Sequence, residues 1–176
     1  WLLYTAGTWT NGQVTTFSTG GAIPAMGNLV AQAFRLIAVE GQGYKCYASA
    51  VGTAHNSADW VSTENIQVGS GSGDPPRTVL ATQAGFLTVL NGRSAYQISM
   101  ESATVASWSS LQVCGHTGCV EGRTAVVIGQ DVFFLSRFGV VNLGALADTV
   151  SIAPQDTLSY PIQPLIDRIN WPYIHK

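Results

Sequence analysis

The sequence predicts an all-β fold, a partial β-propeller of about three to four four-stranded blades with a short C-terminal helix. Hydrophobic runs broken by a glycine-containing turn recur at residues 36–47, 86–98 and 126–135. The turn glycines Gly43, Gly92 and Gly129 lie 49 and 37 residues apart. A hairpin that recurs every ~40 to 50 residues is typical of propeller blades. Such units bury their faces only against neighbours, which favours a scaffold over a reaction centre.

Each hairpin carries its own turn signal. We expect the first to turn at residues 40–43 and the third around residues 129–131. The second contains Asn91-Gly92, the dipeptide favoured in two-residue type I′ turns. A short strand is expected in residues 1–5, followed by a turn at Ala6-Gly7. Residues 107–113 alternate with period two and predict a half-buried strand.

Two segments favour helix. Residues 25–33 are a weak helical candidate. Residues 161–169 place their aliphatic side chains at helical spacing, with Pro164 in the first turn. The expected organisation is therefore propeller blades over residues 1–160 and a helix with a segment leading out of the propeller over residues 161–176.

Residues 69–76 alternate glycine and serine before Asp74 and two prolines, which is the strongest loop signal in the chain. We expect this loop to connect two blades. It lies in the longer of the two intervals between turn glycines, so it is also the first candidate for a contact with a neighbouring subunit.

Charged residues make up 10% of the chain, against about a quarter in an ordinary soluble domain. Such a surface is typical of proteins covered by other subunits, and a secreted β-rich protein with a neutral surface is the alternative. The net charge is −2, and the eight basic residues do not cluster in sequence, which argues against sequence-specific nucleic-acid binding.

The cysteine count and the two ends bound the context of the chain. Three cysteines form no disulfide framework and favour folding in a reducing compartment. No apolar run reaches the ~18 residues of a transmembrane helix. The chain begins at Trp1 within strand-like sequence, so we expect part of a longer polypeptide, with a processed mature protein as the alternative.

The most suggestive chemical cluster contains Cys114, His116 and Cys119, which Cys46 and His55 would have to complete as a zinc site. The cysteine spacing exceeds that of a C-x2-C knuckle, and buried structural cysteines are the favoured interpretation. The ten carboxylates are scattered singly, and no nucleophile elbow or phosphate-binding loop is present. The sequence predicts no enzyme and no catalytic, cofactor-binding or metal-binding residue.

Aromatic and basic side chains are the other binding candidates. Tryptophans at positions 9, 60, 108 and 171 are suited to stacking on sugars or anchoring a partner, but wedging between blades is the favoured role. Arg123 and Arg137, which flank predicted strands, are expected to bridge carboxylates or strand ends rather than bind a ligand.

Several segments, in order, resemble a known family. They are residues 34–39, 47–49, Asp59-Trp60, the loop before residues 78–80, residues 86–98, Gly118-Cys119, residues 126–140 and residues 161–166. Together they are similar to the propeller of tail hub or nozzle proteins of short-tailed phages, including packaged-DNA stabilisation proteins. Residues 131–140 followed by 161–169 are the most specific part.

The resemblance implies a virion structural protein that forms a homo-oligomeric ring, usually of six copies, below the portal and adaptor. Such a ring closes the channel and retains packaged DNA, without sequence specificity, until ejection. The implied location is the virion tail, with the host cytoplasm during assembly, and no membrane is expected as a partner in the assembled state. A receptor- or carbohydrate-binding propeller is the alternative function, and a propeller hydrolase ranks third.

Overall fold

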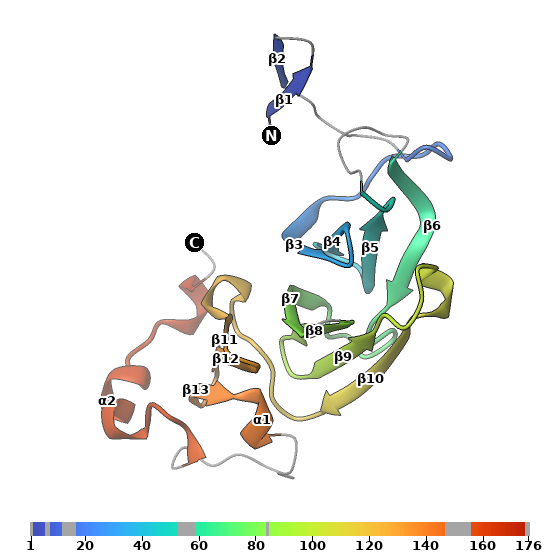
Figure 1. The fold of residues 1–176 in the computed structure, drawn as a ribbon. Coiled ribbons are helices and arrows are strands. Elements are labelled where there is room, and N and C mark those ends of the chain that lie inside the picture. The colour runs from blue at the N-terminus through green and yellow to red at the C-terminus, as the bar shows by residue number, and fades with distance from the viewer. Residues whose placement is uncertain are drawn as a thin grey trace.

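The computed structural model describes residues 2–5, 8–11, 17–52, 59–83, 85–146 and 156–174. Over these ranges the chain is mostly antiparallel β-structure with a few short helical turns (Figure 1). The strands are β1 (Leu2–Thr5), β2 (Thr8–Asn11), β3 (Met26–Gln32), β4 (Arg35–Glu40), β5 (Lys45–Ser49), β6 (Trp60–Gln67), β7 (Pro76–Gln83), β8 (Phe86–Asn91), β9 (Ala95–Ser99), β10 (Ser109–Cys114), β11 (Val126–Ile128), β12 (Asp131–Ser136) and β13 (Gly139–Asn142).

The strands form a β1–β2 hairpin and three larger sheets, in which each strand pairs with its neighbour in sequence. We call β3–β6 the N-terminal sheet, β7–β10 the central sheet and β11–β13 the C-terminal sheet. The first two have four strands and the last has three. The sheets follow one another along an open arc, with β3, β7 and β11 towards its inner side (Figure 1). Strand β7 contacts both β3 and β11.

Neighbouring sheets share their apolar faces. The first core lies between the N-terminal and central sheets and contains Ile37, Val39, Cys46, Ala48, Val68, Val79, Leu87, Val89, Ile98, Met100, Val105 and Trp108. The second core lies between the central and C-terminal sheets and contains Leu90, Ala95, Cys114, Cys119, Val132, Phe134, Val141 and Leu146. The central sheet therefore buries both of its faces, because alternate side chains of each strand point to opposite sides.

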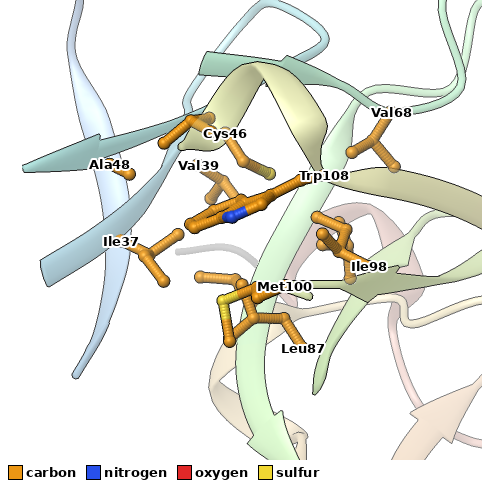
Figure 2. Close-up of a cluster of buried hydrophobic side chains, with 12 residues drawn as sticks. Ile37, Val39, Cys46, Ala48, Val68, Leu87, Ile98, Met100 and Trp108 are labelled. Atoms are coloured by element: carbon orange, nitrogen blue, oxygen red, sulfur yellow. The ribbon is translucent and has the colours of Figure 1, made fainter. Parts of the chain in front are cut away.

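Strand β8 illustrates this alternation. Leu87 and Val89 belong to the first core, whereas Leu90 belongs to the second. Trp108 fills the first core: Figure 2 shows its indole between side chains of the N-terminal and central sheets. Its Nε1–H donates to the carbonyl of Ser102 at 2.9 Å, which satisfies the polar atom of a ring that is only 7% exposed.

The outer sheets differ in how their second faces are covered. An outer cluster of Phe17, Tyr47 and Trp60 covers the far face of the N-terminal sheet. The Phe17 and Tyr47 rings lie 5.2 Å apart in a tilted arrangement. The far face of the C-terminal sheet is less complete. It presents Val126 and Ile128, which are 49% and 60% exposed.

The predicted hairpins are confirmed. Residues 69–76 also connect two sheets, as predicted. Strands β4 and β5 flank residues 41–44, and β8 and β9 flank residues 92–94. Strands β11 and β12 are joined by Gly129-Gln130, with Gly129 at φ 68°. A glycine with positive φ at the first position is the requirement of a two-residue II′ turn. The N-terminal strand is also confirmed as β1, whereas Ala6-Gly7 lies outside the described residues.

The helix predicted at residues 25–33 is wrong, whereas the strand predicted at residues 107–113 is confirmed as β10 but is not half-buried. Residues 25–33 form no helix: β3 pairs with β4 along its length, with an irregularity between Gly27 and Leu29. Pairing along a sheet outweighs the weak local helical preference. Strand β10, predicted as half-buried, is largely exposed because it is an edge strand, and its Leu111 is 67% exposed.

The C-terminal part is helical but short. Helix α2 (Gln163–Ile166) follows a 3₁₀ turn at Tyr160–Ile162 and contains Pro164 in its first turn, as expected. Of its predicted apolar stripe, Ile166 is buried and Leu165 is 60% exposed. A helix that the sequence did not indicate, α1 (Leu143–Leu146), follows β13. No helix among the described residues is long and apolar enough to cross a membrane.

The shared cores predict a clear difference between two leucines of the central sheet. Leu87→Ala removes a fully buried side chain from the first core and should lower the free energy of unfolding by about 2–5 kcal/mol. Leu111→Ala, on the exposed edge strand, should change it by less than ~0.5 kcal/mol. Urea unfolding followed by tryptophan fluorescence measures both, and equal losses would contradict the described packing.

Candidate functional site

The cysteine and histidine segment packs as part of the second core. Cys114 Sγ lies 3.8 Å from His116 Nδ1, and Cys119 Sγ donates to the carbonyl of Glu121 at 2.9 Å. Among the described residues, no three His, Cys, Asp or Glu side chains are grouped in a way that could hold a metal ion. His55, one of the proposed partners, lies outside the described residues.

The three cysteines are free and buried. Burial raises the pKa of Cys46 to about 12. Burial also raises the pKa of Cys119, although the hydrogen bond between its thiol and the Thr124 hydroxyl opposes the shift. Since the thiolate is the reactive form, both side chains behave as small apolar groups at neutral pH.

The tryptophans divide into buried and accessible ones. Trp108 wedges between two sheets, as the sequence predicted, and Trp60 is 4% exposed in the outer cluster. The side chain of Trp9 lies outside the described part of the chain. Trp171 is half-buried and lines a cavity of about 720 Å³. Sequence reasoning treated these tryptophans alike, because their burial depends on packing between distant segments.

The loop of residues 69–76 owes its path to its glycines. Gly69, Gly71 and Gly73 have φ angles of 68°, 79° and 69°. This left-handed region is open to glycine at little cost and disfavoured for other residues, which explains their alternation in the sequence. The Ser72 hydroxyl closes the loop by donating to the carbonyl of Gly69 at 2.6 Å.

Asp74 ties this loop to the turn between β8 and β9. Its Oδ2 accepts from the backbone N–H of Arg93 at 2.9 Å and from the Ser94 hydroxyl at 2.8 Å. Its backbone carbonyl accepts from Asn91 Nδ2 at 2.7 Å. Asn91 is fully buried, and its backbone carbonyl oxygen accepts a hydrogen bond from the backbone N–H of Cys119 at 2.8 Å. One carboxylate and one amide thus fix three chain segments.

This junction overturns the predicted type I′ turn. A type I′ turn needs positive φ at both central residues, and neither Asn91 nor Gly92 has it. Instead, the N–H of Asn91 donates to the carbonyl of Ser94 at 2.8 Å, so these two residues pair and the turn is centred on Gly92-Arg93 rather than on Asn91-Gly92. Glycine at position 92 allows the Asp74 carboxylate to pack against the backbone, since a Cβ there would lie 2.9 Å from Asp74 Oδ1.

A cavity of about 720 Å³ opens beside this junction. It is lined by Gly73, Asp74, Pro75, Arg77, Gly92, Arg93, Val120, Arg137 and Trp171. These residues come from the loop before β7, the start of β7, the β8–β9 turn, the segment before β11, the β12–β13 turn and the C-terminal segment. We call it the arginine cavity, because three of the eight Lys and Arg residues of the chain line it.

The arginine cavity carries excess positive charge. Asp74 is its one lining carboxylate against three lining arginines. Within the described ranges, the recorded ion pair is the distant Arg35–Glu64, at 3.2 Å. Arg137, expected to bridge a carboxylate or strand end, instead lines the cavity without an ion pair to a described residue. The exposed Arg123, the other arginine singled out, lies outside the lining.

Sequence reasoning missed this cavity because its arginines are far apart in the chain. Arg77 lies at the start of β7, Arg93 lies between β8 and β9, and Arg137 lies between β12 and β13. The Ser136-Arg137-Phe138 step contains no strong turn residue before Gly139. Only the stacking of the central and C-terminal sheets brings these turns together.

No protein-family model matches the chain, and no curated protein sequence matches it significantly.

Alanine substitutions at Gly118, which packs against the turn at Asn91, and at Gly27, which serves as the control, form a matched pair. A Cβ at Gly118 would overlap the carbonyl of Asn91 and lie 2.6 Å from the backbone N of Arg93. Gly118→Ala should therefore cost about 1–3 kcal/mol of stability. Gly27 has open space around its Cβ position. Thermal unfolding should separate the variants clearly, and a Gly118→Ala protein as stable as Gly27→Ala would refute the close approach.

Proposed function

We propose that this protein is a structural component of a short-tailed phage tail, part of a hub or nozzle ring below the portal and adaptor. The ring, of about six copies as in the resembling family, closes the channel and retains packaged DNA until ejection. The observation that carries the proposal is the face-to-face stacking of successive antiparallel sheets, each pair sharing one core. This repetition is the way in which propeller blades are built.

The arrangement along the arc supports a propeller as the complete form. The first strands of the three sheets, β3, β7 and β11, run along one side, and outer strands β6 and β10 are in contact. The described sheets leave the arc open, so further sheets would be needed for closure.

The far face of the C-terminal sheet offers a surface for such packing. Val126 pairs with Phe133, and Leu135 pairs with Val140, so these four side chains share this face with Ile128. Val126 and Ile128 are exposed, and the others are half-buried. We expect the apolar face of another sheet of the assembly to cover it, as neighbouring sheets cover each other elsewhere in the chain.

The low charge agrees with the same role. Only 10% of residues are charged and the net charge is −2. A channel wall with few cations lets DNA pass without the counterion release that drives tight binding. The alternative, a receptor- or carbohydrate-binding propeller, rested on exposed tryptophans, and its support is weakened because Trp60 and Trp108 are buried.

The location of the chain is the first test. Immunogold electron microscopy of virus particles from the source, with an antibody raised against this chain, should label the tail channel below the portal. Label confined to capsids or to material outside particles would contradict the proposed function.

The packing surface gives a second test. Ile128→Asp places a charge on the far face of the C-terminal sheet and should abolish ring formation while leaving folding intact, because the side chain is 60% exposed. Leu111→Asp, on the edge of the central sheet and equally exposed, is the control and should assemble normally. Light scattering after gel filtration reports the mass. Assembly that is unchanged by Ile128→Asp would contradict the assigned contact face.

A further inference from the structure

We infer that the arginine cavity binds a nucleoside phosphate, either free or at the end of a nucleic-acid strand. The cavity brings together a group of guanidinium donors, an aromatic wall and a loop rich in left-handed glycines. Its volume of about 720 Å³ lies within the ~300–1,000 Å³ of typical small-molecule sites.

The charge balance selects an anion. Arg77, Arg93 and Arg137 line the cavity with Asp74 as the one lining carboxylate. The Asp74 Oδ2 atom is already engaged by the Arg93 N–H and the Ser94 hydroxyl. All three arginines are exposed, so solvent screens their repulsion and their guanidinium groups are accessible to an anion from solution. Guanidinium groups suit a phosphate because their N–H donors can bind two of its oxygens at once.

The excess charge also fits the valence of the ligand. Three arginines and one aspartate leave a formal charge of +2 on the lining. A phosphate monoester carries about −1.5 to −2 at neutral pH, whereas a single carboxylate carries −1. The phosphate monoester is therefore the better match, and an isolated carboxylate leaves part of the positive charge uncompensated.

Trp171 supplies the second part of the recognition. Its half-buried indole forms part of the wall, together with Pro75 and Val120. An aromatic wall beside cationic groups suits a ligand that joins a flat ring to a phosphate, since bases stack on aromatic side chains at ~1–3 kcal/mol each. The fit is to a nucleotide rather than to inorganic phosphate or a sugar phosphate.

The loop before β7 keeps one wall narrow and polar. Gly73, at φ 69°, has open space at its Cβ position and exposes backbone in the lining of the cavity. Because it carries no side chain, a phosphate can approach the main chain closely here. The Asp74 hydrogen bonds hold this wall in place before any ligand arrives. The site stands independently of ring assembly, since its lining residues come from a single chain.

Isothermal titration calorimetry with deoxyadenosine monophosphate (dAMP) tests the inference in the wild-type chain. We expect saturable binding of dAMP at least tenfold tighter than that of inorganic phosphate, and undetectable binding of deoxyadenosine. Arg93→Gln and Arg137→Gln should each weaken dAMP binding at least tenfold. Arg123→Gln, which changes an exposed arginine outside the cavity, should leave it unchanged. Trp171→Ala should weaken binding, and Trp171→Phe should largely restore it.

A short oligonucleotide with and without a 5′-phosphate distinguishes the two sources. Tighter binding of the phosphorylated strand than of dAMP identifies a strand end, and binding of dAMP alone identifies a free nucleotide. The inference is overturned if dAMP binds no better than inorganic phosphate, if a glutamate-rich peptide binds as tightly as dAMP, or if the Arg93 and Arg137 variants bind like Arg123→Gln. Circular dichroism of each variant confirms that it is folded before titration.

Discussion

The structure depends on the need of each sheet to bury two apolar faces. A single antiparallel sheet that is apolar on both faces leaves them exposed unless neighbouring elements pack against them. The central sheet solves this by contributing Leu87 and Val89 to one core and Leu90 to another. The N-terminal sheet is capped by Phe17 and its cluster on the other side. The far face of the C-terminal sheet is only partly covered, and we propose that another sheet of the assembly packs against it.

Stacking also determines what happens at the ends of the strands. Once two sheets share a core, their turns are brought side by side, and residues distant in sequence become neighbours. Asp74 and Asn91 join the turns of the central sheet to the segment at Cys119. The arginine cavity arises from the same crowding. The stacking of the sheets therefore accounts for both the scaffold and the proposed ligand site, whose residues come from several turns rather than from one hairpin.

Local signals predicted the hairpins well and the long-range features poorly. Gly129 and the glycines of residues 69–76 sit at positions that require positive φ, and this requirement can be read from a single sequence. The conformation of the Asn91-Gly92 turn could not be read in this way, because Asp74, which lies 17 residues earlier, redirects it. For the same reason the sequence did not separate buried from accessible tryptophans. It missed the cavity, whose arginines meet only through packing of the sheets.

The proposed tail function and the inferred nucleotide site both assume that the stacked sheets behave as one body. Native-state hydrogen exchange, measured at increasing urea concentration, tests this assumption most directly. Amide protons of β4, β8 and β12 should converge on one global opening with the same free energy, because each sheet is held by a core that it shares with a neighbour. If β12 exchanges through a separate, low-energy opening while β8 stays protected, the shared second core does not bind the sheets together and the account is wrong.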